Sequence, residues 1–205
     1  MDINADQSRA FNFAEFLRPS FKQEDVIRAT DLSETTLQNY LFHYEREMRL
    51  SMPPPGSGRR RMYSAADAVY LRAVRAISNL GVPPSIAVPL AHHIRAWAAA
   101  MAKDYYQAGF VTLPDRLFAF SSPFEDNATV ICAATYAEIQ ERMKQDGYDY
   151  EAMLVVDGAR IALGASQKLW EPYQLIEMKT LEDWQKAGLE PTESWKARHP
   201  EAEDE

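Results

Sequence analysis

The sequence predicts a mainly α protein with a small α+β part at its C-terminal end. Apolar residues recur at helical spacing between about residues 21 and 106, and beyond residue 110 the period changes to two. Capping residues mark helix starts in both parts. The expected organisation is an N-terminal arm or short helix (1–19), a helical module (20–84), a connecting helix (85–108), an α+β domain (109–180) and an acidic tail (181–205).

The composition predicts a globular protein. The chain has 205 residues, of which 46% are hydrophobic and 11% aromatic, enough for a core. No apolar run of about 18 residues is present, and Asp2 and Asp6 stand where a signal peptide would need a basic segment. We therefore expect a cytoplasmic protein without a membrane partner. The single cysteine, Cys132, excludes an intramolecular disulfide and a cysteine-cluster metal site, and its apolar neighbours favour a core position.

The first residues and the first helix pair carry local signals. Residues 1–18 contain three phenylalanines and a leucine, so a short helix from Asn12 is expected to pack on the body. A helix over about 23–29 is followed by a turn at 30–32, and Ser33 is placed to cap the next helix. In that helix Leu37, Tyr40 and Leu41 fall on one side, leaving the opposite side polar. The exposed polar residues are Thr35, Thr36, Gln38 and Asn39.

A loop and a third helix follow. The stretch Pro53-Pro54-Pro55-Gly56-Ser57-Gly58 cannot continue a helix. It leads into Arg59-Arg60-Arg61, three consecutive guanidinium groups that we expect to be displayed together. The third helix opens at Ser64 with Asp67 in a capping box, and Gly81 ends it. Its apolar stripe is expected to comprise Leu71, Val74, Ile77 and Leu80.

The segment 85–108 predicts a second long helix, interrupted or begun afresh at Pro89. Its apolar stripe consists of Leu90, Ile94, Trp97 and Met101. Such a stripe is either intrachain core or a dimer seam, and spacing does not decide between them; we expect dimerisation there. His92 and His93 have no cysteine or carboxylate cluster at ligand spacing, so we interpret them as surface or interface residues and expect no metal or cofactor.

The C-terminal part predicts strands over 117–120, 129–133, 153–156 and 160–163. Asp157-Gly158 lies between the last two and is typical of a two-residue hairpin turn. Thr135 and Glu138 predict a capping box for a helix over 135–145, which Gly147 stops.

Charge is unevenly distributed along the chain. The net charge is −8, but residues 18–75 contain ten basic and seven acidic residues, while 108–205 contain nine basic and nineteen acidic. Local positive charge suffices to hold phosphates, and an acidic remainder limits indiscriminate binding to DNA. A chance asymmetry around one acidic tail is the alternative interpretation.

Residues 20–84 have the order of a winged helix-turn-helix and resemble the DNA-binding domain of MerR-type regulators. Phe21 to Tyr40 aligns without a gap to that family's opening pattern, and Tyr63-Ser64-Ala65-Ala66-Asp67 with the following apolar ladder matches its second block. The family's usual Arg-Tyr-Tyr-Glu is replaced here by Gln38-Asn39-Tyr40-Leu41. A second register pairs 41–46 with that motif, and the ungapped one retains the Ser33 cap and Thr36-Leu37.

The resemblance implies a nucleoid-associated homodimer on a two-fold operator in double-stranded DNA, with the second helix in the major groove. It implies further that the wing, with Arg59, Arg60 and Arg61, contacts backbone phosphates or the minor groove. It also implies a C-terminal sensor, and one cysteine favours a small organic or protein effector over a metal; a purely assembling C-terminal domain is equally compatible. The expected DNA-binding residues are Lys22, Ser33, Thr35, Thr36, Gln38, Asn39, Tyr40, Arg59, Arg60, Arg61 and Tyr63.

Two other functions compete with a transcriptional regulator. An excisionase-like architectural factor shares the winged helix but is usually smaller and more basic. A protein-interaction module on the same scaffold would suit the negative net charge. An enzyme is not expected, because there is no nucleophile elbow, phosphate-binding glycine loop or metal-ligand spacing around His43, Asp115 or Asp157.

Overall fold

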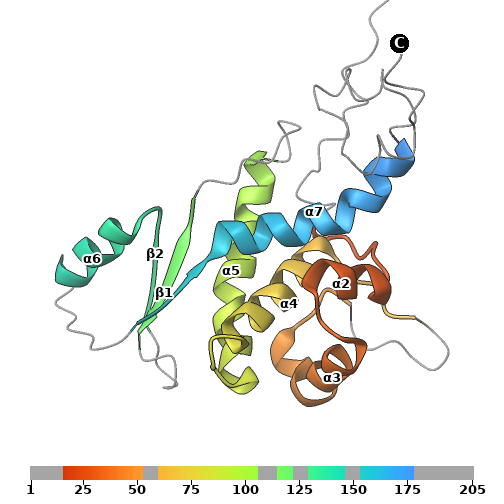
Figure 1. Ribbon diagram of the computed structural model, residues 1–205, viewed down its shortest axis with the longest axis horizontal. Helices are drawn as coiled ribbons and strands as arrows, with labels where there is room; N and C mark the ends of the chain where they lie inside the picture. The colour runs from red at the N-terminus through yellow and green to blue at the C-terminus, as the bar shows by residue number, and fades with distance from the viewer. Residues whose placement is uncertain (1–15, 53–59, 106–114, 122–128, 146–152, 178–205) are drawn as a thin grey trace, which may run out of the picture. The chain divides into compact units, whose positions relative to one another are not determined.

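The computed structural model describes residues 16–52, 60–105, 115–121, 129–145 and 153–177 (Figure 1). The chain divides into two compact units, Arg9–Leu169 and Met1–Ser8 with Trp170–Glu205. All contacts discussed below lie in the first unit. The elements are α2 (Gln23–Thr30), α3 (Glu34–Met48), α4 (Ala65–Ser78), α5 (Pro84–Tyr105), β1 (Leu117–Ser121), β2 (Val130–Ala133), α6 (Tyr136–Gln145), β3 (Met153–Asp157) and α7 (Gly158–Glu177). The protein is thus mainly helical with one small antiparallel sheet.

Helices α2 and α3 are joined by the tight turn that the sequence predicted. Asp31 adopts a left-handed conformation with φ 54°, which Asp tolerates better than most residues. The Ser33 hydroxyl accepts a hydrogen bond from the Thr36 amide at 3.0 Å and so caps α3. Leu37 and Tyr40 are buried, α2 packs on α4, and α3 packs on α5.

A buried carboxylate anchors the start of α4. Ser64 and Asp67 form the predicted capping box, with the Ser64 amide donating to Asp67 Oδ2 at 2.9 Å. Asp67 also accepts from the Ser51 amide at 3.1 Å and pairs with Arg95 of α5 at 3.2 Å. This network joins the end of α3, the start of α4 and α5 around one fully buried side chain.

The apolar ladder of α4 is shorter than predicted. Leu71, Val74 and Ile77 are completely buried, but Leu80 is 57% exposed, so its assignment to the core was wrong. The helix ends at Ser78, and the chain turns at Gly81, whose φ is 91°. Leu80 therefore lies beyond the last helical turn and leaves the stripe.

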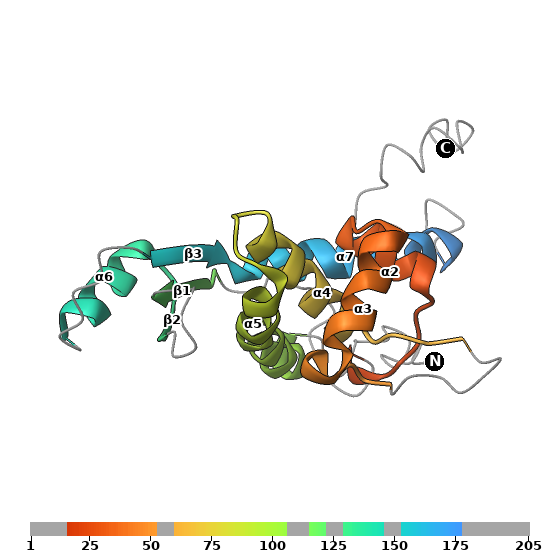
Figure 2. The same cartoon turned by 90° about the horizontal axis from the view of Figure 1, so that it is seen from below.

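Helix α5 runs unbroken through Pro89 and packs along α4 (Figures 1 and 2). Leu90 is 6% exposed and Ile94 is fully buried within this single chain. These two residues belong to the intrachain core, and the dimer seam assigned to them was wrong. Trp97 and Met101 are half-buried, and the Trp97 indole packs edge-on against Phe118 at 5.9 Å between ring centroids.

The three strands lie in the order β2-β1-β3, and both pairings are antiparallel. One face of the sheet carries Ala119, Ile131 and Ala133, which pack with Ile139 of α6. The other face carries Phe118 and Phe120, which contact Trp97 and His93 of α5. The sheet is consequently covered by α6 on one face and by α5 on the other (Figure 2).

The predicted hairpin at Asp157-Gly158 was wrong, because α7 begins there and 160–163 is helical. Asp157 Oδ1 accepts a hydrogen bond from the Arg160 amide at 2.8 Å, as a helix-capping carboxylate does. A Cβ at Gly158 would lie 2.4 Å from Phe118 Cε2, and the Gly158 amide donates to the Arg116 carbonyl at 2.8 Å. The glycine is needed here for close approach to β1.

The helix predicted over 135–145 is confirmed as α6. Its first turn is held by Thr135, whose hydroxyl accepts from the Glu138 amide at 3.2 Å, while the Glu138 carboxylate accepts from Ala134. Of the short helix expected from Asn12, only the last residues are described: Phe16 and Leu17 are helical, and Phe16 is 1% exposed, as expected for packing on the body. The loop 53–58, Arg59, the stop at Gly147 and the tail 181–205 lie outside the described residues.

Candidate nucleic-acid interface

The exposed side of α3 carries the polar residues that the sequence singled out. Thr35, Gln38 and Asn39 are exposed, and Thr36 is half-buried. Helical spacing places Phe42 and His43 one turn further along this side, next to Gln38 and Asn39. Both are exposed, and 83% of Phe42 is accessible. The two alternative alignments of the sequence over α3 therefore place their polar or aromatic residues on the same helix face.

Gln38 is held by a short chain of side-chain hydrogen bonds. Its amide nitrogen donates to the Gln23 oxygen at 3.1 Å, and the Gln23 amide donates in turn to Glu34 at 3.1 Å. These bonds link the first turns of α2 and α3. They orient Gln38, whereas the exposed Asn39 has no such bond among the described residues.

Four other expected contact residues have structural roles. The Ser33 hydroxyl bonds both the Thr36 amide and the Thr36 hydroxyl, the latter at 2.8 Å, so the pair serves the helix cap. Tyr40 is 8% exposed and Tyr63 is fully buried, so their rings belong to the core and their assignment as DNA contacts is corrected. Burial raises the pKa of the Tyr63 hydroxyl.

The segment after the loop pairs with the start of the helical module. Tyr63 forms an isolated antiparallel bridge with Phe21, in which the Tyr63 amide donates to the Phe21 carbonyl at 2.8 Å. This bridge fixes residues 60–63 beside the N-terminal end of α2. Lys22, the residue before α2, is exposed and ion-paired with Glu24 at 3.6 Å.

The three arginines are not displayed together. Arg59 lies outside the described residues and Arg60 is exposed. The Arg61 side chain is only 8% exposed and forms an ion pair with Glu45 of α3. Arg61 therefore anchors residues 60–63 to α3, and its expected contact with phosphates is corrected.

A groove of about 780 Å³ runs between α2, α3 and residues 60–63. Its lining contains the basic residues Lys22, Arg60 and Arg61 and the acidic residues Glu24, Glu34 and Glu45. The formal charges balance, so local positive charge here is weaker than the count over 18–75 indicated. Gln38 and Phe42 also line the groove.

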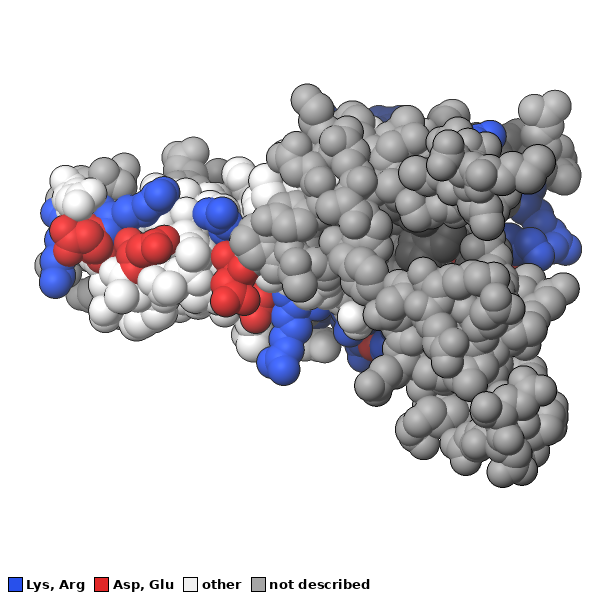
Figure 3. All heavy atoms as spheres, turned by 90° about the horizontal axis from the view of Figure 1, so that it is seen from above, with Lys and Arg blue, Asp and Glu red and all other residues white. Residues whose placement is uncertain are grey.

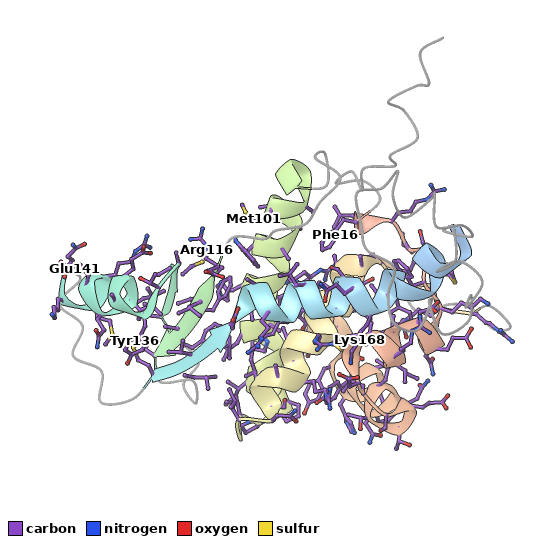
Figure 4. All side chains as sticks on the ribbon, turned by 45° about the horizontal axis from the view of Figure 1, so that its top comes forward. Phe16, Met101, Arg116, Tyr136, Glu141 and Lys168 are labelled. Carbon is purple, nitrogen blue, oxygen red and sulfur yellow. The ribbon has the colours of Figure 1, made fainter. Side chains whose placement is uncertain are left out.

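The turn between α2 and α3 is tied to α4 and α7 by charge. The Asp31 carboxylate pairs with Lys168 at 2.5 Å, Arg75 at 3.2 Å and Arg72 at 3.7 Å. Figure 4 shows Lys168 on the side of α7 that is directed toward these helices. The hydrogen bond from Lys168, aided by the charges of Arg72 and Arg75, lowers the pKa of Asp31.

Of the two α5 histidines, His92 is half-buried and packs against the helical part of the chain, whereas His93 is exposed. His92 Nε2 lies 2.8 Å from the Glu47 carbonyl, and its ring contacts Tyr70 at 4.7 Å. Burial lowers the pKa of both His92 and His93. Cys132 is half-buried on β2, and burial raises the pKa of its thiol.

Within the described residues no group of three or more His, Cys, Asp or Glu side chains is arranged to hold a metal ion. None of the helices in the described ranges is both long and apolar enough to span a membrane. Acidic and basic side chains are interspersed at the α6 end of the molecule (Figure 3).

No protein-family model matches the chain, and no curated protein matches it.

Proposed function

We propose that the protein is a sequence-specific DNA-binding transcriptional regulator of MerR-like type. In this proposal α3 lies in the major groove of double-stranded DNA, Arg60 lies in a wing against the backbone, and two copies bind a two-fold operator. The observation that carries the proposal is the polar, exposed side of α3, which presents Gln38 and Asn39 beyond a capped N-terminus. Amide side chains on a recognition helix pair bidentately with adenine.

The capped turn supports this use of α3. The left-handed Asp31, the Ser33 cap and the Gln23–Gln38 hydrogen bond hold the first turn of α3 in a fixed direction relative to α2. A side chain that reads base edges needs such a rigid support, because misplacement weakens hydrogen bonding. Lys22 and Arg60 are exposed beside it and supply cations for phosphates.

A homodimer remains part of the proposal, although Leu90 and Ile94 do not form its seam. One winged helix covers a single half-site, and specificity among many genomic sites generally requires a second copy. Sedimentation of the full chain at tens of micromolar, with and without a two-fold DNA site, tests this directly. A monomer on such DNA would contradict it.

The experiment for DNA binding is a salt titration. We expect the purified chain to bind selected genomic duplexes with an affinity that falls as salt rises. Arg60→Ala should flatten the slope of log affinity against log salt by about one unit, since it removes one phosphate contact. Arg142→Ala, an exposed arginine of α6, is the matched control and should leave the slope unchanged. Absence of salt-dependent binding would refute the proposal.

A protein-interaction module is the second candidate, and Phe42 favours it. A phenylalanine 83% exposed in a groove of balanced charge suits an apolar anchor on a partner. If the protein binds DNA in the ungapped register, Phe42→Ser should keep its DNA affinity within about threefold of the wild-type value. If the wild-type protein does not bind DNA, the protein-interaction module becomes the better-supported function.

A further inference from the structure

A second groove, of about 400 Å³, lies between the end of α4 and the junction of β3 with α7. Its volume falls in the range of small-molecule sites. Three arginines line it, Arg72 and Arg75 from α4 and Arg160 from α7, against one acidic residue, Asp157. The lining therefore has a formal charge of +2, in contrast to the balanced groove beside α3.

Arg75 and Arg160 have N–H donors that no described group uses. Arg75 uses Nη1 for the Thr30 carbonyl at 2.9 Å and for Asp31, and its side chain is 35% exposed. Arg160 is exposed and has no ion-pair partner among the described residues. A guanidinium carries five N–H donors in a fork that matches a carboxylate. Arg75 and Arg160 thus retain unused donors at the rim of the groove.

Apolar side chains complete the lining. Leu80 is 57% exposed here, although its position in the α4 ladder predicted a buried residue. Val155 of β3 and Ile161 of α7 lie in the same lining. Together with Val155 and Ile161, the exposed Leu80 side chain provides an apolar contact for a hydrocarbon body beside the cationic groups.

We infer that this groove binds a small amphipathic organic carboxylate. The carboxylate contacts Arg160 and Arg75, and the apolar body covers Leu80 and Ile161. Neither half of the lining is sufficient alone, because a simple anion leaves Leu80 uncovered and a neutral apolar molecule leaves Arg160 without a counter-ion, whereas Arg72 and Arg75 already pair with Asp31. The inference does not rest on DNA binding, since it concerns binding of the small molecule itself.

The groove is linked to the α2–α3 turn through shared arginines. Arg72 donates to the Ala29 carbonyl at 2.6 Å, and both Arg72 and Arg75 pair with Asp31. A carboxylate in the groove competes with Asp31 for these cations. Occupancy of the groove and the ion pairs of the turn are consequently coupled.

The test is calorimetric titration of the full chain with octanoate and with benzoate. Octanamide and benzamide are neutral analogues, and acetate supplies the head group without the apolar body. We expect at least one of the two carboxylates to bind saturably, with Kd on the order of 1 mM or tighter, and to bind better than its amide and than acetate. Binding of neither carboxylate, or equal binding of the amides or acetate, would overturn the inference.

Variants locate the site. Arg160→Gln should weaken binding about tenfold, as expected for the loss of a charged hydrogen-bond donor, and Leu80→Ser about threefold. Arg142→Gln on α6 is the matched control and should bind as wild type. Asp31→Asn should tighten binding about threefold by removing the competing carboxylate. Wild-type affinity in Arg160→Gln, with circular dichroism showing a normal fold, would also overturn the assignment.

Discussion

The helical module together with α5, and the sheet region from β1 to α7, differ in what determines their structure. In the module, short-range signals agree with the tertiary contacts, because the Ser33 cap, the Ser64–Asp67 capping box and the left-handed Asp31 are all where local chemistry puts them. In the sheet region a strong local signal, Asp157-Gly158, is overruled by packing against β1. Local signals are therefore a better guide in the first region than in the second.

The largest expected effect concerns the buried network of the module. Asp67→Ala should destabilise the protein by about 3 to 5 kcal/mol, because it leaves Arg95 and the Ser51 and Ser64 amides without their acceptor. Urea denaturation followed by circular dichroism measures this loss. Asp157→Ala, which removes an exposed cap in the sheet region, should cost only about 1 kcal/mol. Equal losses would break the contrast between the two regions.

An intermediate effect is expected at Gly158. Gly158→Ala should cost about 1 to 3 kcal/mol, because the added Cβ collides with the Phe118 ring. Combining it with Phe118→Leu should recover part of that loss relative to the two single changes, which a double-mutant cycle detects. Strict additivity would show that close approach to β1 is not why glycine is needed.

The smallest effect concerns the ion pairs between the regions. The folded-state pKa of Asp31 lies below its ordinary 3.8, so the stabilisation is present above pH 3.8 and disappears as the pH falls through the lower folded value. Asp31→Asn should cost about 1 kcal/mol or less at pH 7, given the exposure of the carboxylate. Thermal unfolding against pH should show the two proteins converging at the acid end. If the difference in stability between wild type and Asp31→Asn grew as the pH fell, the ionised Asp31 carboxylate would not be stabilising the fold.

Several parts of the fold and site were beyond reach of the sequence for physical reasons. The ion pairs Arg61–Glu45 and Arg95–Asp67 join residues 16 and 28 positions apart. Helical and strand periods predict contacts only between residues close in the sequence, so they do not predict these pairs. The sequence predicted an exposed Arg61 because it follows a loop and two arginines. In the structure its guanidinium pairs with the Glu45 carboxylate of α3, and the side chain is buried. Leu90 and Ile94 formed a regular stripe, but spacing does not distinguish a neighbouring helix from a second chain.

The exposed side of α3 was predictable because one period determines both its buried and its exposed residues. Leu37 and Tyr40 face the core, and Thr35, Gln38 and Asn39 face outward as expected. The groove at Leu80 was not predictable, because it depends on where α4 ends and on α7, which the hairpin prediction replaced by a strand. Its residues come from segments about 80 positions apart.

The most direct test of the account is the specificity of Asn39→Ala. Fluorescence anisotropy measures the affinity of three proteins for the duplex selected from genomic fragments and for a random duplex. The proteins are wild type, Asn39→Ala and the matched control Gln140→Ala, which changes an exposed amide of α6. The account predicts that Asn39→Ala loses about 1 to 3 kcal/mol on the selected duplex and almost nothing on the random one, while Gln140→Ala matches wild type on both. Equal losses of Asn39→Ala on both duplexes, or no loss on either, would contradict base reading by α3.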